Sequence, residues 1–186
     1  MKKIVIVSGH PDLKVSLANK TILDEISQKL PEAEIRKLDE LYPDCKFDVK
    51  AEQKALEAAD IIVFQYPIHW YGAPGILKLY IDKVMEHGWA YDSKGNALKG
   101  KSFVASVTSG VPEQAYSANT PMKHTLEEYS YGIKQYAEMC GMDFKNLCAI
   151  YGAMYVPGVT TDEKKAELVA RVKDHAGKLI DYLKTL

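Results

Sequence analysis

The chain has 186 residues, of which 47% are apolar and 26% are charged, enough to bury the core of one compact domain without disulfides. Its 24 Lys and Arg residues nearly balance its 25 Asp and Glu residues. This balance argues against nucleic acid or an anionic membrane surface as a partner, so we expect a small-molecule partner.

The three cysteines, Cys45, Cys140 and Cys148, form neither a CxxC motif nor a Cys/His cluster with metal-ligand spacing. Their odd number argues against a disulfide framework, and we expect no metal site. The first apolar segment spans only residues 4–7, too few for a signal peptide or a membrane span. The expected location is cytoplasmic.

The first half of the chain alternates between strand and helix patterns. A β-branched run over 3–8 predicts a strand, and a helical period follows from Ser16. A weaker strand over 33–38, a helix over 51–59 and a strand over 61–64 come next. A further helix begins near Pro74; its solvent face would carry Lys78, Asp82 and Glu86, and its sheet face Ile76, Leu79, Tyr80 and Val84.

The second half continues the same alternation. Strands are predicted over 101–107 and 146–151, separated by a helix that runs from Leu126 to near Gly141. Thr160 and Glu163 would form a capping box for a last helix. This order predicts a single α/β domain over residues 1–186, with a five-stranded parallel sheet of order 2-1-3-4-5 and helices on both faces.

In this topology the loops after strands one, three and four share one sheet edge. The first loop, 8–19, leads into a helix N-terminus that attracts phosphate, and His10, Ser16 and Asn19 add polar side chains. Ser16 could instead be a plain N-cap, and His10 an exposed loop residue. The loop contains neither GxGxxG nor GxxxxGK[ST], which removes the main support for a dinucleotide fold or nucleotide hydrolysis.

The second loop, 65–74, places aromatic residues between two prolines and could hold a flat ring. Trp70 and Tyr71 could equally be core aromatics. The third loop, 108–111, offers two hydroxyl groups, although such residues are also common in ordinary turns. Together the three loops suit a phosphorylated planar cofactor such as flavin mononucleotide (FMN).

Over nearly its whole length the chain resembles the flavodoxin-like NAD(P)H:quinone oxidoreductases, especially the short branch that includes ancillary oxidoreductase subunits of glutathione-regulated potassium-efflux systems. The resemblance is carried by HP at 10–11, SLAN at 16–19, LYPD at 41–44, AEQ at 51–53, ADIIVFQYP at 59–67, WY at 70–71, LKLYIDKV at 77–84 and HGWAY at 87–91. It implies a flavodoxin-like three-layer sandwich.

The resemblance also implies roles for the residues of the three loops. The phosphate and ribityl chain would be held by His10, Ser16, Leu17, Ala18 and Asn19. The isoalloxazine ring would lie between Pro67, Ile68, His69, Trp70 and Tyr71 on one side and Thr108, Ser109, Gly110 and Val111 on the other. FMN is favoured over FAD because the larger FAD-binding relatives carry a carboxyl-terminal extension.

Two positions depart from the family pattern. The third loop is usually Thr-Thr-Gly-Gly, whereas this chain has Val111 at the last position, a residue that resists positive φ and could narrow the ring pocket. Tyr116 falls where larger relatives carry an active-site tyrosine, and we predict that it is catalytic; otherwise it is an aromatic residue on a mobile loop. The histidine that partners this tyrosine in those relatives is replaced by Met122, and its role is not transferred to His124.

The implied activity is a ping-pong reaction in which NAD(P)H reduces the flavin and a quinone or similar electrophile then accepts the electrons. Backbone N–H groups of residues 69–71 and 110–111 would stabilise the charge that develops. A flavodoxin-type electron carrier is less favoured, because such carriers are strongly acidic and this chain has a net charge of −1. A regulatory role beside a potassium-efflux membrane protein stays open, as does a homodimer formed through Trp89, Tyr91 or residues 112–123.

Overall fold

The computed structural model describes residues 2–186 and contains a parallel sheet in the order β2-β1-β3-β4-β5. Its strands are β1 (Ile4–Ser8), β2 (Glu34–Lys37), β3 (Ile61–Pro67), β4 (Ser102–Thr108) and β5 (Asp143–Ile150). Every residue of β1, β3 and β4 is buried, as expected for strands covered on both faces. The predicted α/β fold and strand order are confirmed.

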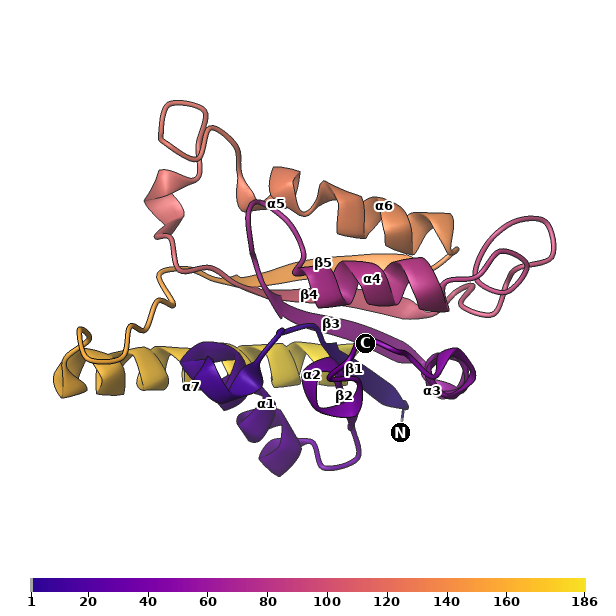
Figure 1. Cartoon of the computed structure of the whole chain (residues 1–186), viewed down its shortest axis with the longest axis horizontal. Coiled ribbons are helices and arrows are strands. Elements are labelled where there is room, and N and C mark those ends of the chain that lie inside the picture. Colours follow the sequence, from indigo (N-terminus) through magenta and orange to yellow (C-terminus); the bar gives the residue numbers. More distant parts are fainter. Residues whose placement is uncertain (1) are drawn as a thin grey trace.

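Helices form a layer on each side of the sheet (Figure 1). One layer consists of α1 (Leu17–Lys29) and α7 (Asp162–Thr185), which share an apolar core with one sheet face. The other consists of α2 (Leu38–Leu41), α3 (Val49–Ala58), α4 (Gly75–Val84), α5 (Leu126–Tyr129) and α6 (Tyr131–Met139). Two short 3-10 turns, η1 (Leu13–Val15) and η2 (Glu113–Ala115), lie in loops at the carboxyl edge of the sheet. Within residues 2–186, no helix combines the length and apolarity that crossing a bilayer requires.

Two helix predictions differ from the structure. The helix expected from Leu126 to near Gly141 is interrupted at Ser130, which separates α5 from α6. The last helix is capped by Thr161, whose hydroxyl accepts from the Lys164 N–H at 3.3 Å. The neighbouring Thr160 hydroxyl instead accepts from the Val156 N–H at 2.9 Å, so the predicted Thr160–Glu163 capping box does not form.

The buried face of α4 includes Tyr80 and Val84, as predicted, but its third fully buried residue is Leu77. Ile76 and Leu79 are only half-buried. The position of Leu77 also explains why residue 9 is a glycine, because a Cβ atom on residue 9 would lie 2.7 Å from the Leu77 Cβ. Gly9 therefore lets α4 pack directly against the first loop of the sheet edge.

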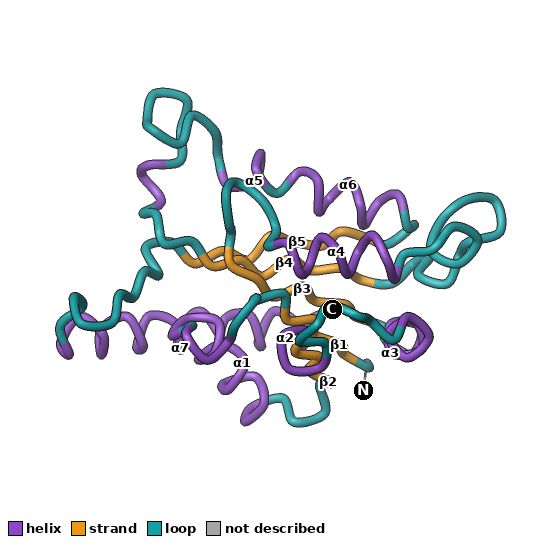
Figure 2. Tube along the Cα trace, viewed as in Figure 1, coloured by secondary structure: helices purple, strands orange, loops and turns teal. Residues whose placement is uncertain are grey.

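Figure 2 shows which loops share an edge of the sheet. Residues 109–125 and 151–161 leave the carboxyl ends of β4 and β5, whereas 85–101 lies at the opposite edge, before β4. Trp89 and Tyr91 lie in that opposite loop and are half-buried against the core, and the Trp89 indole N–H donates to Glu57 at 2.6 Å. The carboxyl edge is where α/β sheets of this type bind ligands.

Candidate functional site

Two adjoining cavities open at the carboxyl edge of the sheet. The larger, of about 370 Å³, is lined by predicted residues from all three loops: His10, Ser16, Leu17, Ala18, Asn19, Pro67, Ile68, His69, Thr108, Gly110 and Val111. The smaller, of about 200 Å³, is lined by Ile68, Trp70, Tyr71, Ser109, Gly110, Val111, Tyr116 and Met122. The fold thus brings every predicted site residue to one place, and Ile68, Gly110 and Val111 belong to both cavities.

The N-terminus of α1 forms one wall of the larger cavity. The Ser16 hydroxyl accepts from the Asn19 N–H at 3.2 Å, so Ser16 is an N-cap as well as a lining residue. The N–H groups of Leu17 and Ala18 donate to no described residue. These free donors and the positive end of the helix dipole favour an anion here.

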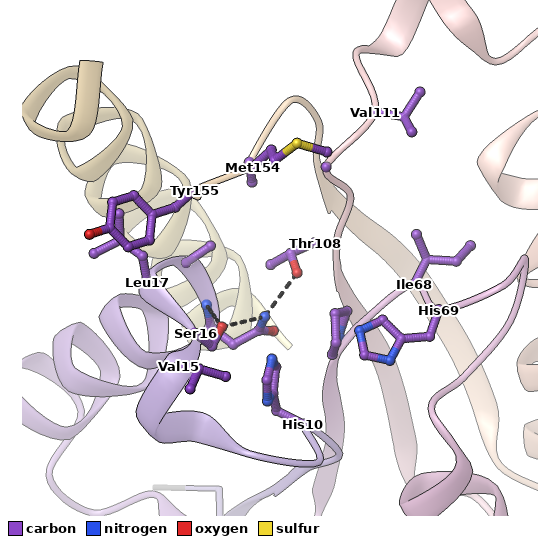
Figure 3. Close-up of a pocket in the computed structure, with 15 residues that line it drawn as sticks. His10, Val15, Ser16, Leu17, Ile68, His69, Thr108, Val111, Met154 and Tyr155 are labelled. Atoms are coloured by element: carbon purple, nitrogen blue, oxygen red, sulfur yellow. Dashed lines mark hydrogen bonds between the residues drawn. The ribbon is translucent and has the colours of Figure 1, made fainter. Parts of the chain in front are cut away.

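A carboxamide network joins the loops at the floor of this cavity. Asn19 Nδ2 donates to Ser16 Oγ at 3.1 Å and to Thr108 Oγ1 at 3.0 Å, and Asn19 Oδ1 accepts from Gln65 Nε2 at 2.9 Å. In Figure 3 the dashed lines run from Ser16 to Thr108 through this amide. Because Asn19 and Gln65 are buried, the network fixes α1, β3 and β4 relative to one another.

His10 is buried rather than exposed, and its ring has a defined tautomer. Its Nδ1 accepts from the Asp12 N–H at 3.0 Å, so the neutral ring carries its hydrogen on Nε2. Burial and the nearby His69 lower the pKa of His10, although Asp39 and Asp12 act in the opposite direction. At neutral pH, His10 is therefore an uncharged donor in the cavity wall.

The aromatic loop closes in a tight two-residue hairpin. His69 and Gly72 exchange N–H···O bonds of 2.9 and 3.0 Å, and the residues between them, Trp70 and Tyr71, have φ values of 44° and 67°. Positive φ at both central positions defines a type I′ turn, which ordinarily takes Asn-Gly. Trp70 is 93% exposed, whereas the Tyr71 ring packs on Tyr129 at 5.0 Å between centroids.

The third loop is ordered by Ser109. Its Oγ accepts from the Val111 N–H at 3.0 Å and shares a hydrogen bond of 2.8 Å with the Tyr116 hydroxyl. Val111 does not have a positive φ, so its β-branch fits the backbone without strain.

Two of the predicted backbone donors are already engaged, because the N–H groups of His69 and Val111 bond within their own loops. Those of Trp70, Tyr71 and Gly110 donate to no described residue. The prediction that all five face a ligand was therefore wrong for His69 and Val111, whose turns use them to close.

Tyr116 is held in place rather than carried on a free loop. Besides the bond to Ser109, its ring contacts Tyr151 edge-on at 5.5 Å between centroids. Met122 lines the same small cavity. His124 does not line it; its Nδ1 lies 3.4 Å from Glu128 Oε2 on the exposed side of the loop.

Sequence reasoning missed a fourth loop. Ala153, Met154 and Tyr155, which follow β5, line the larger cavity, and Val15 does so from the first loop. The Ala153 N–H donates to the Ser109 carbonyl at 2.7 Å, which pins the two loops together. A Cβ on Gly110 would lie 3.1 Å from the Met154 methyl group, so the third and fourth loops lie close together at this point. The signal was available, since β5 ends at the same sheet edge.

The donor set fits a phosphorylated planar ligand. The larger cavity offers helix N–H groups, hydroxyls and a neutral histidine but no Lys or Arg side chain, while the smaller is largely aromatic and apolar. Together they fall in the size range of small-ligand sites, roughly 300–1,000 Å³. Within residues 2–186, no group of three His, Cys, Asp or Glu residues is placed to hold a metal ion.

Comparisons with known proteins agree with this geometry. The profile of a family described by its flavodoxin-like fold matches residues 2–176. A glutathione-regulated potassium-efflux system ancillary protein, KefF of Klebsiella aerogenes, is 47% identical over 180 residues, which are 96% of either chain.

Two solved structures are similar over nearly their whole length. General stress protein 14 of Treponema denticola, in complex with FMN, is 30% identical with a TM-score of 0.85, covering 96% of this chain and 98% of that one. An NADPH-quinone reductase from P. pentosaceus is 25% identical with a TM-score of 0.75, covering 95% and 98%. The chain therefore belongs to this flavodoxin-like family, in which it is closely similar to the KefF ancillary proteins.

Proposed function

We propose that this protein is a flavin-dependent oxidoreductase that transfers two electrons from NAD(P)H through FMN to quinones or similar electrophiles. The observation that carries the proposal is the junction of an anion-binding cavity with an aromatic one, at Ile68, Gly110 and Val111. A phosphate at the α1 N-terminus and a ring at the junction would occupy both. The similarity to the T. denticola protein in complex with FMN and to the P. pentosaceus NADPH-quinone reductase supports this assignment.

The cofactor, when bound, supplies the hydride chemistry, accepting from NAD(P)H and passing electrons to the acceptor. The chain's own task is to position it. His10 and residues 16–19 would hold the phosphate and ribityl chain, residues 67–71 one edge of the ring, and residues 108–111 the other. FMN is preferred to FAD because the similar T. denticola protein is in complex with FMN.

The small cavity also suggests the order of events. The free N–H groups of Trp70, Tyr71 and Gly110 would stabilise negative charge on the ring edge, because fixed backbone dipoles need no reorganisation. Val111 and Met122 add apolar surface to the same space. Since donor and acceptor would both have to reach the ring through this one small cavity, they would bind in turn, which is ping-pong kinetics.

Tyr116 would hold a proton at its hydroxyl, in reach of the acceptor. The 2.8 Å bond to Ser109 keeps that hydroxyl at the cavity wall. We expect Tyr116→Phe to lower kcat for quinone reduction by about 100-fold, the lower end of the range for general acid catalysis, with FMN affinity unchanged. Tyr131→Phe, which alters an exposed tyrosine on α6, is the matched control. Equal kcat values for the wild type and Tyr116→Phe would remove Tyr116 from the reaction.

The activity is tested with the purified holoprotein. Stopped-flow mixing with NADH or NADPH should bleach the flavin directly, and a quinone should restore its colour in a second mix. An electron carrier of the flavodoxin type would not be bleached by the dinucleotide at a catalytically competent rate. That result would reject the enzyme in favour of the carrier.

A second function is favoured by the 47% identity to a KefF ancillary protein over 96% of both chains. We propose that the same flavoprotein regulates a potassium-efflux system, as a cytoplasmic homodimer that binds its membrane component from the inner face. Catalysis and regulation can coexist. Co-expression with the efflux protein, followed by detergent extraction and affinity capture, should recover the complex; light scattering of the captured flavoprotein gives its oligomeric state.

A further inference from the structure

The side chain of Asn19 lies between two hydroxyl groups that face the larger cavity. Its Nδ2 has two hydrogens, and both are used: one bonds Ser16 Oγ at 3.1 Å, the other Thr108 Oγ1 at 3.0 Å. Its Oδ1 is occupied by Gln65 Nε2 at 2.9 Å. Asn19 is 2% exposed and Gln65 is fully buried, so solvent does not compete for these bonds.

The direction of these bonds decides what the hydroxyls can offer to a ligand. A hydroxyl group has one hydrogen and two lone pairs. Ser16 Oγ accepts from both the Asn19 backbone N–H and Asn19 Nδ2, which fills its two lone pairs. Thr108 Oγ1 likewise accepts from Nδ2. Neither hydroxyl donates to a described residue, so both hydrogens are left for the cavity.

The direction of the two hydroxyl hydrogens matters because no Lys or Arg lines the cavity. An anionic ligand is then recognised by neutral donors alone, and a hydroxyl that turned a lone pair toward it would be repulsive. In Figure 3, Ser16 and Thr108 lie among the labelled residues that line the cavity.

We propose that Asn19 is a positioning residue, which need not touch the flavin and instead turns the Ser16 and Thr108 hydroxyls into hydrogen-bond donors toward it. This inference rests on the proposed flavin site. A substitution of Asn19 would then weaken FMN binding because the Ser16 and Thr108 hydroxyl groups no longer point their hydrogens at the ligand, and not because Asn19 itself loses a contact with FMN.

A double-mutant cycle tests the proposal, with FMN affinity of the apoprotein as the readout. Thr108→Val removes a hydroxyl without changing shape and should weaken FMN binding about tenfold. Asn19→Asp replaces the donor with a carboxylate that accepts from both hydroxyls, and should weaken binding about 100-fold. In the Asn19→Asp background, Thr108→Val should change affinity less than about twofold, because the Thr108 hydrogen is then already bound to the carboxylate.

Repulsion between the new carboxylate and the phosphate would weaken binding in both Thr108 backgrounds alike, so it cannot produce this non-additivity. Tyr131→Phe, at an exposed position on α6 that lines neither cavity, is the control and should bind FMN like the wild type. If the fold-loss of FMN affinity in the double variant equals the product of the two single losses within about twofold, the proposal is wrong.

A second variant guards against misfolding of Asn19→Asp. Gln65→Met removes the donor that fixes the Asn19 amide and leaves no new charge. The freed amide can rotate, so Thr108→Val should again cost less in this background than in the wild type; an unchanged tenfold cost would contradict the proposal. Wild-type protein that binds no FMN would reject the proposed function itself, whereas wild-type binding with a multiplicative cycle would reject only the role of Asn19.

Discussion

Trp70 and Tyr71 occupy backbone conformations that favour glycine and asparagine. A positive φ costs an ordinary residue about 1–2 kcal/mol, and such strain persists chiefly where function requires it. The strained turn at 69–72 thus lowers the stability of the fold, and it places the Trp70 indole and the Tyr71 phenol ring at the small cavity.

Relief of this strain should therefore stabilise the fold and impair the site. We expect Trp70→Asn to raise the free energy of unfolding of the apoprotein by about 0.5–1 kcal/mol in urea titrations, because Asn tolerates positive φ and Trp70 is 93% exposed. The same variant should raise KM for the quinone. Tyr131→Asn, at an exposed helical position, should not stabilise; a loss of stability in Trp70→Asn would show that the turn is unstrained.

Buried His10 and half-buried His175 link the stability of the fold to pH. Burial lowers the pKa of His10, with His69 adding to the effect, and burial and Lys178 lower the pKa of His175. The unfolded chain then binds more protons than the folded one just below pH 6.5, so stability is full above that pH and is lost as pH falls toward the folded pKa values.

The free energy of unfolding should accordingly fall between pH 7.5 and 5.5, and His10→Gln with His175→Gln together should flatten that decline. His87→Gln and His124→Gln, which alter exposed side chains, serve as controls. If the free energy of unfolding falls equally steeply with pH in the His10/His175 variant and in the His87/His124 variant, then groups other than His10 and His175 cause the pH dependence.

At the scale of elements, α3 is anchored by a buried carboxylate. Glu52 is fully buried and accepts from Arg36 Nε at 2.7 Å, from the Tyr42 hydroxyl at 2.5 Å and from the Tyr80 hydroxyl at 3.1 Å. The ion pair raises the pKa of Arg36, while burial and the bond to Glu52 raise the pKa of Tyr42 to about 12. The network joins β2, α3 and α4 and gives the conspicuous Ala51-Glu52-Gln53 motif a structural purpose.

Removal of this anchor should be costly. Glu52→Ala leaves a guanidinium and two phenol groups without their acceptor, and we expect it to lower the free energy of unfolding by about 3–5 kcal/mol. Glu32→Ala, at an exposed loop position, should change it by less than about 0.5 kcal/mol. Equilibrium urea unfolding measures both, and a change below about 1 kcal/mol for Glu52→Ala would mean that the network relaxes or hydrates.

The elements themselves were largely predictable, because hydrophobic periodicity reports burial directly. Errors occurred where a local hydrogen bond decided the outcome. Two adjacent threonines precede α7, and sequence alone could not tell that Thr160 would bond Val156 while Thr161 capped the helix. The purpose of Glu52 was hidden for a similar reason, since its partners come from distant segments.

For the whole molecule, the strand order was the step that turned separate loops into one site. Once β1, β3 and β4 are parallel neighbours, their following loops must meet, and the residues predicted from those loops do line two adjoining cavities. The same reasoning applied to β5 would have added Met154 and Tyr155. The strand order could not predict the hydrogen bonds within the site. It gave neither the loop N–H groups that stay free nor the orientation of the Asn19 side-chain amide.

A titration of the apoprotein with FMN shows whether the two joined cavities bind this cofactor. We expect saturable quenching of flavin fluorescence with one FMN per chain, accompanied by a shift of the visible absorption bands as the ring enters the apolar cavity. Affinity for riboflavin should be weaker, because the α1 N-terminus then holds no phosphate. Absorption and fluorescence that stay those of free FMN throughout the titration would show that the cavities do not bind it.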